Sequence, residues 1–117
     1  MALRDLSGAV DFTVLETMVG DDLATLDEVL ALFCEQAALW SGALDPAGEG
    51  WRDAAHALKG TAAGIGAHAL QGACDEVERA DPALASAAIT RLHDRLAEAL
   101  TDVAAYRHAL MLRTLKA

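Results

Sequence analysis

The residues in this sequence whose types and spacing could do chemistry are His56, Lys59 and Gly60. A histidine side chain ordinarily has a pKa of about 6.5, so its uncharged ring is a nucleophile near neutral pH. A lysine three residues later lies on the same side of a helix and can face the oxygens of a phosphate on the ring. A glycine four residues later costs helix stability but leaves open space beside the ring. Together they suit an exposed histidine that attacks an acyl phosphate on a partner.

A helical wheel of residues 51–65 separates these three residues from an apolar face. The apolar positions fall within a sector of about 60° and are Trp51, Ala54, Leu58, Ala62 and Ile65, with Ala55 at the edge. His56 lies on the opposite side, and its predicted neighbours there are Arg52, Asp53, Lys59, Gly60 and Ala63. An exposed histidine on a helix is often only a surface residue, so spacing alone leaves its role open.

Capping and breaking residues divide the chain into five predicted helices. Gly20 ends a short apolar stretch, and an acidic cap opens the next helix. Asp45-Pro46 and Asp81-Pro82 each have the pattern of an N-cap followed by proline at the first helical position. The helices are expected near residues 11–19, 22–42, 46–65, 67–80 and 82–113. The third begins only at Gly50 if Gly48 and Gly50 weaken its first turn, and the chain after about residue 110 is expected to fray.

Two long apolar stripes in the second and fifth predicted helices indicate a shared core. Their spacings alternate between three and four residues, as expected for helices packed on one side. The stripes are Leu23, Leu26, Leu30, Phe33, Ala37, Trp40 and Leu44, and Ile89, Leu92, Leu96, Ala99, Val103, Tyr106 and Leu110. The fourth helix adds Leu70, Cys74 and Val77. Short connections favour antiparallel neighbours, so we predict an all-α fold. It is an up-down antiparallel four-helix bundle with a short extra N-terminal helix, in one domain over 1–117 with its core at about 11–110.

Composition narrows the function classes. The chain has 117 residues and a net charge of -9, which argues against non-specific nucleic-acid binding and against an anionic membrane surface. Cys34 and Cys74 lie far apart in apolar helical sequence, so both are expected to be reduced core residues. Arg4 and Asp5 interrupt the start of the chain, and no apolar run is long enough to span a membrane. We therefore expect a cytoplasmic protein.

The segment from His56 to Ala67 closely resembles the signature of histidine phosphotransfer (HPt) domains. It reads His-Ala-Leu-Lys-Gly-Thr-Ala-Ala-Gly-Ile-Gly-Ala, against a family pattern of His, a small residue, Leu-Lys-Gly, Ser or Thr, small residues and Gly-Ala. The resemblance runs from about Asp11 to Asp81, through Val19-Gly20-Asp21-Asp22 and Val77-Glu78. One departure is Ala57, where the family often has Thr or Ser; it lies beside the core, so little consequence is expected.

The resemblance implies roles for individual residues. His56 would be phosphorylated on its outward ring nitrogen, Lys59 would stabilise the phosphate, and Gly60 would leave room for the ring and the partner. Glu78 matches a position where the family often has a polar residue such as Gln. A carboxylate can accept from an imidazole N–H but cannot donate to phosphate, so its role is open. The short first helix, with Phe12, Leu15, Met18 and Val19, would be either part of the docking surface or a lid on the core.

The implied partners are response-regulator receiver domains and a hybrid sensor histidine kinase. The protein would carry a phosphoryl group between receiver aspartates as a monomer, without an ATP-binding or kinase domain. It would need no cofactor, since Mg²⁺ belongs to the receiver's acidic site. A different function keeps the motif but not the transfer: a helical module that binds or sequesters a receiver or kinase. A third, a dimeric phosphotransferase with a degenerate kinase-like domain, does not fit the length unless the chain is a fragment.

The other histidines and the cysteines suggest no second site. His68 is expected to be solvated near a helix start, and His93 and His108 lie off the apolar stripe of the last helix. No two histidines have the spacing of a metal site, and no glycine-flanked nucleophile or phosphate-binding loop is present. Arg52, Asp53 and Ala63, which surround His56, are candidates for partner specificity.

Overall fold

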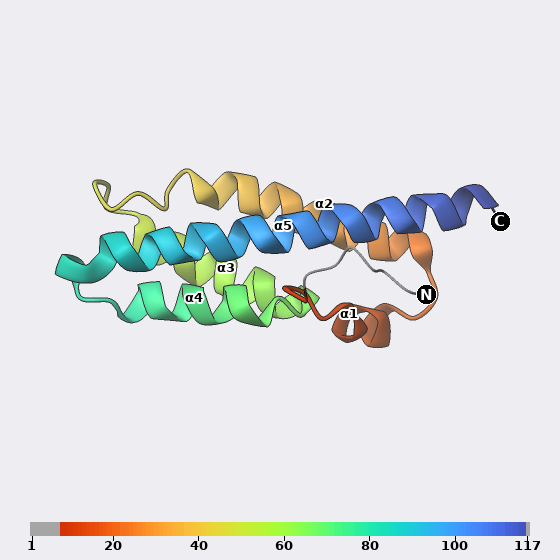
Figure 1. Cartoon of the computed structure of the whole chain (residues 1–117), viewed down its shortest axis with the longest axis horizontal. Coiled ribbons are helices and arrows are strands. Elements are labelled where there is room, and N and C mark those ends of the chain that lie inside the picture. The colour runs from red at the N-terminus through yellow and green to blue at the C-terminus, as the bar shows by residue number, and fades with distance from the viewer. Residues whose placement is uncertain (1–7, 117) are drawn as a thin grey trace.

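The computed structural model describes residues 8–116, so Arg4 and Asp5 lie outside the described residues. The elements are α1 (Phe12–Val19), α2 (Leu23–Ser41), α3 (Trp51–Ile65), α4 (His68–Arg79), a 3₁₀ turn η1 (Pro82–Leu84) and α5 (Ala85–Lys116). Figure 1 shows α5 running the length of the bundle, with α1 at one end. The predicted all-α bundle with a short extra N-terminal helix is confirmed. Within residues 8–116, no helix has the length and apolar character needed to cross a membrane.

The four long helices form a closed ring of neighbours. α3 packs against α2 and α4, and α5 closes the ring by packing against the same two helices. The two stripes and the apolar face of α3 meet in the core, where Leu30, Leu58, Leu92 and Val103 have no solvent exposure. Burial of these faces is the main stabilising contribution and leaves the opposite faces of α3 and α4 for other purposes.

The helix α1 is fixed to the bundle at two places. The Asp11 backbone N–H, at the N-cap of α1, donates to the Gly66 carbonyl at 2.8 Å. The rings of Phe12 and Tyr106 stack with centroids 4.0 Å apart, and the Tyr106 hydroxyl donates to the Glu16 carboxylate. Phe12 and Leu15 are buried, which supports a lid on the core for these two residues, whereas Met18 is exposed.

Three helix boundaries differ from the prediction, one of them at the start of the fifth helix, where Pro82–Leu84 form η1 and α5 begins at Ala85. Asp45-Pro46 does not open the third helix: the Asp45 carboxylate accepts from the Ala47 N–H in a turn, and α3 begins at Trp51 after Gly50. Gly48 and Gly50 weaken any earlier helical turn, as the alternative start allowed for. The last helix continues to Lys116, beyond the expected end near residue 113, and its residues from 111 on are exposed; the fraying expected after about residue 110 stays a prediction.

The predicted core residues differ in how far they are buried, and some are less buried than expected. Cys74 is fully buried, and burial raises the pKa of its thiol to about 12. Cys34 is only partly buried and packs at the margin of the core, as do Leu23 and Trp40. Leu44 is buried, but it lies beyond the end of α2. Periodicity identifies the side of a helix that faces the core, but it does not show which residues at the ends of a stripe are buried by neighbouring helices.

Candidate functional site

His56 lies on the exposed side of α3, as the helical wheel predicted. Its side chain is 73% exposed, while Ala54, Ala55 and Leu58 on the same helix are fully buried. The ring therefore stands on a rigid helix whose other side is fixed in the core. A nucleophile held in this way is accessible to a partner without any change in the fold.

The partner of the His56 ring within the protein is Glu78 of α4. Nδ1 of His56 lies 2.9 Å from Oε2 of Glu78. The Lys59 ammonium, and to a smaller extent the His56 ring, lowers the pKa of the Glu78 carboxyl, so this group is ionised near neutral pH. An ionised carboxylate can only accept hydrogen bonds, so Nδ1 carries the proton. In the neutral ring, the nucleophilic lone pair is then on Nε2.

Lys59 lies between two carboxylates of α4. Its Nζ is 2.6 Å from Oε1 of Glu78 and 3.5 Å from Oδ1 of Asp75. The Glu78 contact is a short ion pair, and it is the closer of the two. The Glu78 carboxylate, with a smaller effect from Asp75, raises the pKa of Lys59. We call His56, Lys59, Asp75 and Glu78 the His56 cluster.

Asp75 was not among the residues singled out from the sequence. It precedes Glu78 by three residues on α4, so the two carboxylates share a side of that helix. Its other oxygen, Oδ2, is 3.1 Å from Nε of Arg79. The spacing of Asp75, Glu78 and Arg79 was visible in the sequence, but the antiparallel register that brings them to Lys59 was not.

Gly60 borders the cluster on the outer side of α3. A Cβ built at this position meets no atom within 4 Å, and the same holds for Gly64 one turn later. Gly60, Ala63 and Gly64 are all exposed. Packing inside this protein therefore does not require glycine at position 60, and the open space faces solvent next to His56.

Arg52 and Asp53 lie on the exposed side of α3 before His56. The Arg52 guanidinium donates to the carbonyl oxygens of Glu78 and Ala80, at 3.2 and 2.6 Å, and lies 4.5 Å from the Trp51 ring centroid. It thus satisfies carbonyl groups at the end of α4 and ties that end to α3. This contact gives Arg52 a structural role whether or not a partner also touches it.

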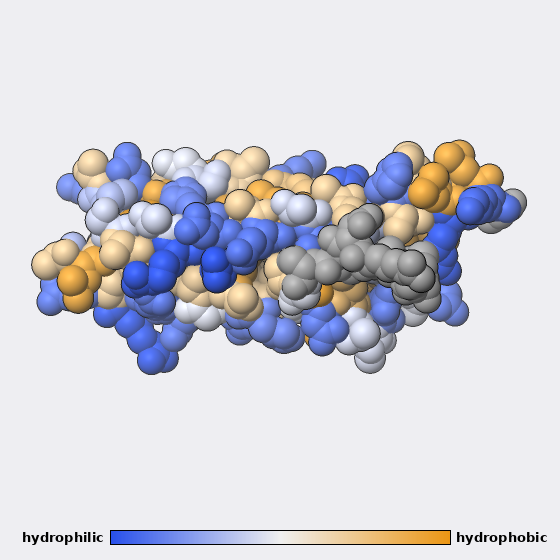
Figure 2. Space-filling view, in the orientation of Figure 1, coloured by the Kyte–Doolittle hydropathy of each residue, from blue (hydrophilic) through white to orange (hydrophobic). Residues whose placement is uncertain are grey.

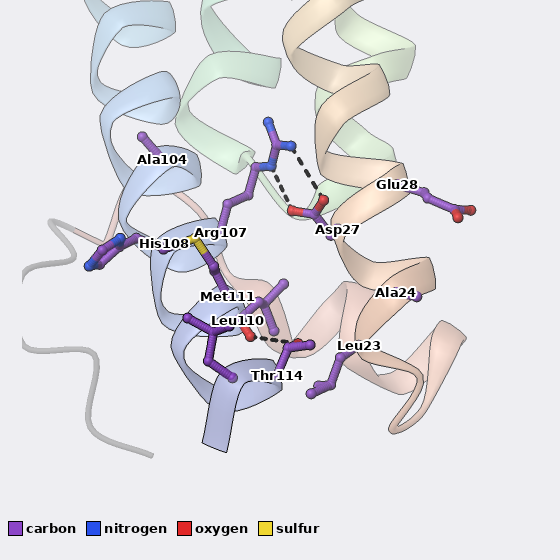
Figure 3. Close-up of a pocket in the computed structure, with 11 residues that line it drawn as sticks. Leu23, Ala24, Asp27, Glu28, Ala104, Arg107, His108, Leu110, Met111 and Thr114 are labelled. Carbon is purple, nitrogen blue, oxygen red and sulfur yellow. Dashed lines mark hydrogen bonds and ion pairs between the residues drawn. The ribbon is translucent and has the colours of Figure 1, made fainter. Parts of the chain in front are cut away.

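The pocket found in the structure lies away from this cluster. It has a volume of about 850 Å³ and lies between α2 and α5, with Leu23, Leu110 and Met111 among its apolar walls. Figure 3 shows the Arg107 guanidinium paired with Asp27 across it. In Figure 2 the surface where α5 ends is coloured as hydrophobic, and Met111, Leu112 and Leu115 are exposed there. None of the pocket residues belongs to α3 or α4, and His56 lies outside the pocket on an open surface.

The other histidines stay apart from His56. His68 begins α4 and is exposed, and His108 lines the pocket. A ring nitrogen of His93 lies 3.0 Å from the Leu44 carbonyl oxygen, a contact that fixes the α2–α3 connection. Within residues 8–116, no group of three or more His, Cys, Asp or Glu residues has the arrangement of a metal site.

Comparisons with known proteins agree with this geometry. The model of the Hpt domain family matches residues 12–105. Among solved structures, the crystal structure of the histidine phosphotransferase ShpA from Caulobacter crescentus has a TM-score of 0.80 and 45% sequence identity. That match covers 92% of this chain and 99% of that one. A search of curated proteins gives no match.

This chain belongs to the Hpt domain family, because the family model covers most of its length. Membership supports a role in phosphotransfer within two-component signalling.

Proposed function

We propose that this protein accepts a phosphoryl group on Nε2 of His56 from a phosphorylated receiver aspartate and passes it to the aspartate of another receiver. The observation that carries the proposal is the 2.9 Å contact between His56 Nδ1 and Glu78, on a ring that is 73% exposed. The contact assigns the proton to one nitrogen and leaves the other as the nucleophile. The contact supports a role for Glu78 as the acceptor of the Nδ1 proton.

The transfer step conserves atoms and charge. The Nε2 lone pair attacks the phosphorus of the aspartyl phosphate, the bond from phosphorus to the acyl oxygen breaks, and the receiver's aspartate leaves as a carboxylate. The ring becomes a phosphoimidazolium whose positive charge is balanced by Glu78 through Nδ1–H. In the onward step, a second aspartate attacks the phosphorus and the neutral ring leaves with its proton still on Nδ1. Alignment by the docked receiver, and charge neutralisation there, supply most of the acceleration.

The remaining roles belong to the same proposal. Lys59 stabilises the phosphate on His56, and Gly60 gives space to the ring and the receiver's loops. The partners are response-regulator receiver domains and a hybrid sensor histidine kinase, which a cytoplasmic, monomeric protein would meet in turn. Mg²⁺ acts in the receiver's acidic site, and this chain binds neither ATP nor a cofactor of its own. Asp53 and Ala63, on the exposed side of α3, are candidates for contact with the partner.

Phosphotransfer from a panel of receiver domains, each labelled with acetyl phosphate and Mg²⁺, tests the proposal. We expect wild type to take up label as an acid-labile, base-stable adduct and His56→Gln to take up none. His108→Gln is the matched control, since it removes an exposed histidine from α5 and should leave transfer unchanged.

A measurement of receiver binding, made beside this assay, separates the second candidate function, a binding module that does not transfer. If wild type and His56→Gln bind a receiver equally and neither accepts phosphate, the protein sequesters its partner. The intact arrangement of His56, Lys59 and Glu78 favours transfer over sequestration.

A further inference from the structure

The carboxylates around Lys59 compete with a phosphate on His56 for the lysine's charge. This inference rests on the proposed function. The phosphoryl group of a phosphohistidine carries close to two negative charges near neutral pH and is stabilised by a nearby cation. Lys59 is the lysine on the same side of α3, one turn beyond His56. In the unphosphorylated protein this lysine is already paired with Glu78 at 2.6 Å and lies 3.5 Å from Asp75.

A phosphate can therefore gain Lys59 only in competition with the two carboxylates. Glu78 cannot move far without giving up Nδ1 of His56, to which it is bound through its other oxygen. Asp75 has no contact with the His56 ring; its contacts are with Lys59 and, through Oδ2, with Arg79. The residue whose charge opposes the phosphate without holding the ring's proton is thus Asp75.

We propose that Asp75 is a positioning residue that draws Lys59 away from the phosphate on His56 and so favours onward transfer over retention. The phosphorylated state is disfavoured because Lys59 must leave a carboxylate pair, and because Asp75 adds negative charge beside the phosphate. Transfer to a receiver aspartate releases both penalties. The protein then acts as a carrier with a bias toward giving up its phosphoryl group.

The expected size is modest, because all of these groups are partly exposed. The side chains of Lys59 and Asp75 are 30% and 38% exposed, and exposed ion pairs contribute little. Asp75→Asn should raise the equilibrium ratio of phospho-His56 to phosphorylated receiver by about two- to fivefold. The change should shrink at high salt, since salt screens exposed charges.

The matched control is Glu76→Gln, which removes the same charge from the next position of α4. Glu76 pairs with Arg91 of α5, away from Lys59, so this variant reports the general effect of removing one charge. Arg79→Gln should change the ratio of phospho-His56 to phosphorylated receiver in the direction opposite to Asp75→Asn. Removing this cation leaves Asp75 with Lys59 alone, so the fraction of phospho-His56 should fall.

The measurement is the equilibrium ratio of the two phosphorylated proteins, approached from both directions at low and high salt. A structural role for Asp75 would change the unfolding free energy but not this ratio among folded molecules. If wild type transfers and Asp75→Asn has the same ratio as Glu76→Gln, the role of Asp75 is overturned while the proposed function stands. If wild type accepts no phosphate from any receiver, both proposals fail together.

Discussion

The His56 cluster and the end of the molecule around α1 use polar contacts in opposite ways. At the α1 end, which comprises α1, Gly66 and the facing parts of α2 and α5, the contacts between helices join distant parts of the chain. Tyr106 donates to Glu16, and Arg107 bonds both oxygens of Asp27, at 2.7 and 3.3 Å. These pairs join α5 to α1 and α2, and the Asp11–Gly66 hydrogen bond adds the α3–α4 connection, so each of these groups finds its partner within the protein.

In the His56 cluster, some groups can still form hydrogen bonds or ion pairs with a partner. Nε2 of His56 has no hydrogen bond among the described residues, and the ring is mostly exposed. Lys59 contacts two carboxylates at once, Glu78 at 2.6 Å and Asp75 at 3.5 Å. Groups held in this way can change partners when a phosphate arrives, whereas those at the α1 end cannot do so without loosening the fold. The difference indicates where the protein is built for stability and where for exchange.

Substitutions at Gly66, the C-cap of α3, and at Gly60 within α3 test the comparison most strongly, and Gly66 has the larger expected effect. Gly66 has φ of +81°, and a Cβ there would lie 2.2 Å from the Asp11 carbonyl oxygen. Gly66→Ala should therefore destabilise the protein by about 3 kcal/mol, from left-handed backbone strain and displacement of α1. Urea unfolding measures this, with Gly72→Ala as the control, because a Cβ at Gly72 meets open space. Equal stability of Gly66→Ala and wild type would mean that α1 is not fixed through this contact.

Substitution of Gly60 should change stability in the direction opposite to substitution of Gly66. Gly60→Ala places a methyl group in solvent inside a helix, so the free energy of unfolding should rise by about 0.5–1 kcal/mol. The rate of phosphotransfer should nevertheless fall, because the methyl group occupies space that the receiver needs. Gly64→Ala is the matched control and should be stabilised without loss of transfer. A Gly60→Ala variant that transfers at the wild-type rate would remove the functional reason for glycine at this position.

The sequence was sufficient for the fold and for the exposed position of His56. The stripe through Leu58 and the stripes of α2 and α5 repeat with the period of a helix, so each predicts its buried side directly. The same period puts His56 on the other side. The resemblance of residues 56–67 to the family signature then added the chemistry that spacing alone left open.

Contacts between helices could not be predicted in this way. Lys59 reaches Asp75 across 16 residues, and Tyr106 reaches Glu16 across 90. Such pairs depend on how far one helix is shifted along its neighbour, which the periodicity of either helix does not determine. The start of α3 was misjudged for a different reason: Asp45-Pro46 has the composition of a helix start, but the glycines after it favour a turn.

The smallest expected effect concerns the ion pair at the α1 end. The Arg107 guanidinium lowers the pKa of the Asp27 carboxyl below its ordinary value of 3.8. A carboxyl whose pKa is lowered by folding contributes stability above its unfolded pKa and loses it as the pH falls through the folded pKa. Asp27→Asn should thus be less stable than wild type near neutral pH, by at most about 1 kcal/mol for so exposed a pair.

The difference in unfolding free energy between wild type and Asp27→Asn should disappear at low pH. There the pH falls through the lowered pKa of Asp27, and wild type also loses this charge. Urea unfolding from about pH 7 down to about pH 2.5 measures it. Glu28→Gln is the control, since its carboxylate lines the same pocket but makes no ion pair among the described residues. A gap that stays constant down to the lowest pH would show that Asp27 acts through shape and not through charge. In that case the contrast with the His56 cluster would rest on the hydrogen bonds of Gly66 with Asp11 and of Tyr106 with Glu16.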